Sequence, residues 1–344
     1  WKNLLFYDEH TWGAHNSISQ PDRKFVTAQW EVKRSFAWRA NWAATDLATR
    51  SLNRLAQNIS IEGPTMFVFN LEPRARTGVV EFELDSRRRL VDPATGAAVP
   101  VEVIREQQGY RVQRFLARDV PGFGYRAYRV EAVPGNPAPA PRPHQDAWQI
   151  ESRYYRVTFD RQTGAIASIF DKDLGRELAD AGAPYTLNQL LYVSGGDKSR
   201  LMSAEVHLKP PSFDISSSYG ASLIENNGKR IVIRAQARTV PEVETEVMVY
   251  DELKRIDIVN RLRKEAIREK EAVYFAFPFF VKPPELAVQI QNAWVRPNVD
   301  QLPGACRDWF TTQNVVVARD NQVAIAWATP DAPLVTLTDI NRGL

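Results

Sequence analysis

The hydrophobic pattern of the chain changes its period once, at Gly63-Pro64, and this change limits the possible folds more than any other feature. Before it, apolar residues recur about every 3.6 residues, which is the spacing of an amphipathic helix. After it, apolar and polar residues alternate, as in strands with one buried face. A chain of 344 residues is long enough for roughly two or three separate cores. We therefore expect an α+β, mainly β protein in which a helical segment precedes β-sandwich domains.

The first part of the chain predicts a long helix. Ser19 is a capping residue type, Pro21 and Asp22 suit a first turn, and nothing breaks the pattern before Gly63. Apolar side chains follow the helical period at Phe25, Val32, Phe36, Ala40, Ala43, Leu47, Leu55 and Ile59. A second stripe consists of Trp30, Trp38 and Trp42, which we interpret as core residues. Because a helix with two apolar sides needs partners on both, we assign residues 1–62 to a truncated helical bundle.

Residues 63–134 predict a small β-sandwich. Alternating segments occur at 66–71, 78–84, 99–105, 110–118 and 124–133, and short turns separate them. We interpret Arg87-Arg88-Arg89 as a solvated turn, because acidic residues flank it and no aromatic residue is interleaved. Prolines are frequent in residues 135–147 and cannot join a ladder, so we expect a semi-rigid linker there.

Residues 148–344 predict a large antiparallel β-sandwich, since strand-like segments follow one another without a helical pattern between them. These segments are 154–159, 165–170, 231–239, 244–250, 255–262, 272–280, 315–318 and 323–328. The five residues from Asp160 to Gly164 have the composition of a hairpin turn. The chain opens on an apolar, helix-like segment at Trp1 and stops shortly after a strand-like one, so we expect it to be part of a longer protein.

The charge balance and the apolar runs exclude two classes of function. With 44 basic and 41 acidic residues, the net charge of +3 gives no strong field for nucleic acid or acidic lipid. The longest membrane-like run, 272–281, has about ten residues where a bilayer requires roughly twenty. The single cysteine, Cys306, cannot form an internal disulfide, so the compartment stays open between cytoplasm and periplasm. The sequence does not indicate an oligomeric state.

One short cluster has the residue types of a ligand site. His10 alone among the four histidines stands beside several acids, in Asp8-Glu9-His10, at the end of an apolar helical segment and before a Gly turn. These side chains can contribute one or two ligands to a divalent ion. The alternative is an ordinary solvated helix end. His15 does not strengthen the case, because five residues further on it lies off the face of His10.

The segment from Asn3 to Ala14 resembles the place where family 38 α-mannosidases carry a helix that ends in a His-Asp pair and is followed by glycine. In this chain Asp8 and Glu9 stand at the position of the pair, and His10 is displaced beyond them. Further segments similar to that family are 66–71, 120–125, 154–160, 164–172, 176–178 and 270–278, so the resemblance runs nearly from end to end.

This resemblance implies that the chain is the C-terminal portion of such an enzyme, without its N-terminal catalytic barrel. It implies a retaining glycosidase that acts on mannose-containing glycans through two carboxylates about 5 Å apart, both on the missing barrel. The chain would then contain no catalytic residue and be inactive alone. His10 would be a zinc ligand, Asp8 and Glu9 would contact sugar or metal, and the barrel would be the partner of these domains.

Two other hypotheses remain open at this point. The first is a free-standing, non-catalytic carbohydrate-binding β-sandwich, in which Trp294, Trp309 and the Gln313-Asn314 pair contact the sugar. It differs from the enzyme hypothesis by requiring sugar binding by the chain alone. The second is a nucleic-acid or signalling module, which the absence of a basic face in the sequence disfavours.

Overall fold

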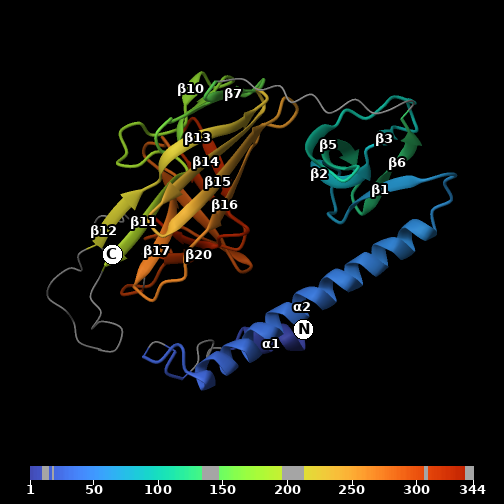
Figure 1. The fold of residues 1–344 in the computed structure, drawn as a ribbon. Helices are drawn as coiled ribbons and strands as arrows, with labels where there is room; N and C mark the ends of the chain where they lie inside the picture. The colour runs from blue at the N-terminus through green and yellow to red at the C-terminus, as the bar shows by residue number, and fades with distance from the viewer. Residues whose placement is uncertain (10–14, 18, 134–146, 196–212, 306–308, 338–344) are drawn as a thin grey trace. The chain divides into compact units, whose positions relative to one another are not determined.

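A computed structural model describes the chain except for residues 10–14, 18, 134–146, 196–212, 306–308 and 338–344 (Figure 1). Two compact units are present, Trp1–Ala140 and Pro141–Leu344. In the first, two helices precede six strands, whereas every regular element described in the second is a strand. The mainly β composition predicted from the sequence is therefore observed. None of the described helices is long and apolar enough to cross a membrane.

The helical part consists of α1 (Lys2–Tyr7) and α2 (Lys24–Gln57) in the described residues. The two helices contact each other through the stacked rings of Phe6 and Phe36, whose centroids lie 5.4 Å apart. The prediction that Ser19 caps the long helix is wrong, because α2 begins later and has Arg23 as its N-cap. The predicted breaker at Gly63 is consistent with the observed end, since the backbone N–H of Asn58 already bonds to the carbonyl of Leu55.

The apolar stripes of α2 are mostly exposed. Val26 is its only buried residue, while Phe25, Val32, Leu47 and Leu55 are exposed. Interpreting the tryptophan stripe as core is wrong for Trp38 and Trp42, whose exposed fractions are 65% and 74%. Helical periodicity identifies the face that is apolar, but it does not tell whether another element covers that face. The bundle therefore stays a prediction.

The small sandwich contains two antiparallel three-stranded sheets, ordered β1-β6-β3 and β2-β5-β4. The first sheet consists of β1 (Thr65–Asn70), β6 (Gly124–Ala132) and β3 (Arg88–Val91). The second consists of β2 (Arg76–Asp85), β5 (Tyr110–Val120) and β4 (Glu102–Gln107). Their core includes Leu90, Ala117 and Val120, and the rings of Phe115 and Tyr128 meet edge to face at 4.9 Å.

Strand β3 corrects one sequence interpretation. Arg87 lies in the turn, where its backbone N–H and its guanidinium both donate to Asp85, but Arg88 and Arg89 already belong to the strand. The following Leu90 and Val91 are almost fully buried and anchor the strand in the sandwich. The sequence did not indicate this strand, because its first two residues are exposed arginines and its apolar part is only two residues long.

The second unit contains five described sheets (Figure 1). One has the order β10-β9-β8-β7, with bounds Arg176–Glu177, Ile166–Asp171, Tyr155–Phe159 and Gln149–Glu151. A second has the order β12-β11-β17, with bounds Phe213–Ser217, Gln189–Gly195 and Glu271–Ala276. A third has the order β13-β14-β15-β16, with bounds Tyr219–Asn226, Arg230–Ala237, Val240–Val249 and Ile256–Arg263. A fourth has the order β19-β18-β21-β22, with bounds Ala293–Val295, Glu285–Ile290, Val315–Arg319 and Ala324–Ala328. The fifth is a pair formed by β20 (Trp309–Thr311) and β23 (Leu334–Thr336).

The main core of this unit is shared by several sheets. It joins residues of β8 and β9, of β14 and β15, and of β21, among them Val157, Ile169, Ile233, Val247 and Ala318. These residues come from three different sheets, so the sheets are layers around one core.

The hairpin predicted at 160–164 is present and connects β8 with β9. Asp160 Oδ1 accepts hydrogen bonds from the backbone N–H groups of Gln162 and Thr163. Gly164 has a φ of +76°, and a Cβ there would come within 2.9 Å of the side chain of Ile233. Glycine is therefore required both by the backbone conformation and by the close approach of the core.

Two ion pairs connect elements of the large unit. Arg230 Nε lies 2.8 Å from Glu246 Oε1 across β14 and β15, and both side chains are almost completely buried. Arg176 Nη2 lies 2.9 Å from Asp320 Oδ2 and also donates to the carbonyl of Phe280. The second pair joins the β10 hairpin to the turn between β21 and β22.

Candidate functional site

Asp8 and Glu9 lie directly after α1, and they are the part of the predicted ligand cluster that the structure places. Helix α1 ends at Tyr7, and Asp8 is its C-cap residue, whose backbone N–H donates to the carbonyl of Leu4. Asp8 is exposed. His10 falls outside the described residues, so its predicted role as a metal ligand is a prediction still.

Glu9 forms an ion pair with Lys33 of α2. Glu9 Oε1 lies 2.9 Å from Lys33 Nζ, and the exposed fractions of the two side chains are 37% and 19%. This contact joins residues 24 positions apart in the sequence. Sequence reasoning missed Lys33, although one signal was available. Lys33 is a charged residue within the stripe that contains Val32 and Phe36, and a lysine on an apolar helix face requires a partner or an exit to solvent.

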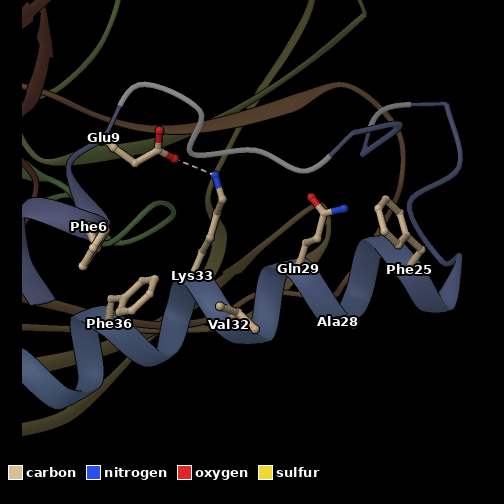
Figure 2. Close-up of a pocket in the computed structure, with 8 residues that line it drawn as sticks. All are labelled: Phe6, Glu9, Phe25, Ala28, Gln29, Val32, Lys33 and Phe36. Atoms are coloured by element: carbon tan, nitrogen blue, oxygen red, sulfur yellow. Dashed lines mark hydrogen bonds and ion pairs between the residues drawn. The ribbon is translucent and has the colours of Figure 1, made fainter.

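An apolar groove lies beside this ion pair, between α1 and α2 (Figure 2). Its volume is about 660 Å³, and it is lined by Phe6, Glu9, Phe25, Ala28, Gln29, Val32, Lys33 and Phe36. Figure 2 shows the α2 members following one another along the helix, with Glu9 reaching toward Lys33. A sugar ring requires several hydrogen-bonding groups, but here two of the three polar side chains already bind each other. The groove therefore suits apolar side chains better than a pyranose.

The described residues do not form a zinc site. A structural or catalytic zinc ion takes three or four protein ligands. In the portion of the chain that the structure describes, no group of three or more His, Cys, Asp or Glu side chains could hold a metal ion. Glu9 is bound to the ammonium group of Lys33, so a cation would have to displace that group. His15 is exposed and adds no ligand to this segment.

The two tryptophans that were considered as sugar contacts lie in the large unit. Trp309 in β20 stacks on Tyr274 of β17 with centroids 5.8 Å apart and remains 39% exposed. Trp294 in β19 is 52% exposed. Asn314 donates to the side chain of Gln289 at 3.3 Å, and Gln313 bonds to the same residue through its backbone N–H. Trp309 thus packs against Tyr274 with one face of its ring, whereas Trp294 is more exposed to solvent.

Comparison with solved structures places these observations in a fold class. An α-mannosidase from Enterococcus faecalis V583 is similar to this chain with a TM-score of 0.66, over 98% of this chain and 45% of the mannosidase. The sequences are 13% identical, so the likeness concerns the fold alone. No protein-family model and no curated protein matches the sequence.

The fold is therefore similar to that of an α-mannosidase. The chain spans less than half the length of the mannosidase that it resembles.

Proposed function

We propose that this chain is the non-catalytic, C-terminal portion of a metal-dependent family 38 glycoside hydrolase that acts on α-mannosides. The observation that supports this most is that nearly the whole chain follows the fold of an α-mannosidase. More than half of that mannosidase has no counterpart here, which leaves room for a separate catalytic domain. Its two carboxylates would perform the retaining reaction, one as nucleophile and one as general acid and base.

The exposed apolar side chains on the two stripes of α2 support a role as packing surfaces for that catalytic domain. Phe25, Val32, Trp38 and Trp42 are all exposed, and the apolar groove adds to the same helix pair. Monomeric proteins rarely expose contiguous apolar surface beyond a few hundred Å². A catalytic domain of the same polypeptide is the occupant that the length of the similar mannosidase favours.

The segment after α1 would then belong to the rim of the active-site cleft. Asp8 is the exposed carboxylate in this segment and would accept hydrogen bonds from mannose hydroxyls of a glycan. His10 would be the ligand that this chain contributes to a zinc ion, with the remaining ligands on the catalytic domain. When bound, such an ion would hold the hydroxyl groups of the sugar.

The proposal is tested by comparing the α-mannosidase activity of two polypeptides. The 344-residue chain should release no nitrophenol from p-nitrophenyl α-mannoside with zinc, above a buffer control. The polypeptide extended at its N-terminus by the coding sequence should hydrolyse the α-mannoside and leave the β-mannoside intact. Turnover by the 344-residue chain would show that the catalytic carboxylates lie within it. Failure of the extended protein to hydrolyse any α-mannoside would refute the proposal.

A second candidate function is a carbohydrate-binding module without catalysis. The observation that favours it is the exposure of Trp294 and Trp309, since exposed indole rings stack on sugars. Calorimetry of the 344-residue chain with mannose and mannobiose decides between the two functions. Binding that is lost in Trp294→Ala or Trp309→Ala would favour the module, and absence of heat would favour the scaffold role.

A further inference from the structure

The contact between Lys33 and Glu9 differs from other ion pairs of α2. Arg34 pairs with Glu31, and Arg50 pairs with Asp46, but these contacts stay within one helix and their arginines are more than half exposed. Lys33 instead reaches from α2 to the residue that follows Asp8, and its side chain is 19% exposed. The Lys33–Glu9 pair therefore connects two segments of the chain, whereas the other two pairs lie on the surface of α2 alone.

Lys33 lines the apolar groove and carries its charge to the edge of that groove, where Glu9 lies. Val32 and Phe36 line the same groove as Lys33, so its aliphatic stem lies along apolar surface while its ammonium group meets Glu9. On the other side of Asp8, α1 is fixed by the stack of Phe6 on Phe36. The short stretch with Asp8 thus has an attachment to α2 at each end, one apolar and one ionic.

We propose that Lys33 is a positioning residue, which holds Glu9 against α2 so that the exposed carboxylate of Asp8 is presented to a ligand. The nature of that ligand, a mannoside, rests on the proposed function. The two neighbouring acids then have different roles: Glu9 fixes the segment and Asp8 meets the hydroxyl groups. A single contact of 2.9 Å at one carboxylate oxygen is within reach of an arginine, so Lys33→Arg should preserve the positioning and Lys33→Met should abolish it.

A spin label at residue 8 tests the positioning without any sugar. The only cysteine of the chain is Cys306, so Cys306→Ser with Asp8→Cys gives one labelling site. We expect the label to be restricted in the presence of Lys33, severalfold more mobile in Lys33→Met, and restricted again in Lys33→Arg. Glu9→Gln, which keeps Lys33, should free the label in the same way. Arg34→Met is the matched control and should leave the spectrum unchanged.

The melting temperature of each variant, followed by circular dichroism, shows whether it has folded. A Lys33→Met variant that is folded and has the spectrum of the parent would overturn the positioning role. If Lys33→Met does not fold, the comparison between Glu9→Gln and the parent decides in its place. Unchanged mobility in Glu9→Gln would then overturn the proposal.

Kinetics of the extended polypeptide test the link to the ligand. With Asp8 intact, kcat/KM for an α-mannoside should fall about tenfold or more in Lys33→Met, because a misplaced contact group loses much of its effect. It should recover in Lys33→Arg and be unchanged in Arg34→Met. If Asp8→Asn lowers kcat/KM but Lys33→Met does not, the positioning role is wrong. If Asp8→Asn has no effect, the proposed sugar contact is wrong, and the spin label still decides the role of Lys33.

Discussion

Helix α2 and strand β14 both contain several apolar residues, but those of the helix are mostly exposed to some degree whereas those of the strand are buried. One residue of α2 is buried out of 34, whereas six of the eight residues of β14 are buried. The strand has its partners within its own unit, where β13 and β15 flank it and the other sheets cover the core. Among the described residues of its own unit, most of the apolar stripe of α2 has no such cover.

This difference separates the parts of the chain that stabilise its own fold from the part that is available to a neighbour. Burial contributes about 25 cal/mol for each Å² of apolar surface removed from water, so an exposed stripe adds little to the stability of this chain. The proposed interface with a catalytic domain would account for these exposed apolar residues of α2. The four predictions below test this separation.

The largest effect is expected in the core of the large unit. Ile233→Ala removes a side chain that is 1% exposed and leaves a cavity between three sheets, so it should lower the free energy of unfolding by about 4 kcal/mol. Val32→Ala on α2 should lower it by less than about 0.5 kcal/mol. Urea unfolding of both variants measures the difference. Similar losses in the two would mean that α2 is covered in solution and would break the comparison.

The second largest loss of stability is expected when the buried ion pair between Arg230 and Glu246 is broken. Burial opposes the charge of Arg230, but Glu246 and Glu225 outweigh it and keep the pKa of Arg230 above its ordinary value. Glu246→Gln should therefore lower the free energy of unfolding by about 3 kcal/mol, because it leaves a buried cation with an incomplete partner set. The exposed pair on α2 is the control, and Arg34→Met should cost less than about 1 kcal/mol. Equal costs in urea unfolding would contradict the distinction.

The third effect depends on pH. The hydrogen bond from Arg176, together with backbone N–H donors, holds the pKa of Asp320 well below its ordinary value. A carboxyl group whose pKa is lower in the folded state stabilises at neutral pH, and this stabilisation is lost as the pH falls below about 4. The urea midpoint of the parent should exceed that of Asp320→Asn at pH 7, and the gap should narrow toward about pH 2. A constant gap would show that the ion pair does not contribute through its charge.

The strands show which parts of the fold were predictable from sequence. Strands in which burial alternates along the chain, such as β5 and β8, were found because alternation is a local property. Strand β11 was missed because four consecutive residues are buried and no alternation remains. Strand β13 was missed because the 45% exposed Ile224 follows the partly buried Leu223, so its apolar residues do not alternate even though its burial does.

The candidate site was less predictable, because its contacts are not local. The sequence identified Asp8 and Glu9 as ligand types, but it could not pair Glu9 with a lysine in another helix. It also assigned Trp38 and Trp42 to a core, since periodicity does not reveal whether a partner covers the apolar face. Both failures concern the same missing information, which is the relation between α2 and the elements around it.

The smallest effect on stability, and the one that most sharpens the comparison, is expected for the exposed tryptophans. Trp38→Ser combined with Trp42→Ser should change the free energy of unfolding of the 344-residue chain by less than about 0.5 kcal/mol, because neither side chain loses substantial contacts. In the extended polypeptide the same variant should lower the melting temperature and the yield of folded protein, since a covered interface would lose two large aromatic anchors. Leu52→Ser serves as the control for helix propensity, as it lies on the same helix and is only partly exposed. A large loss already in the 344-residue chain would place these tryptophans in its own fold and remove the main argument for an interface.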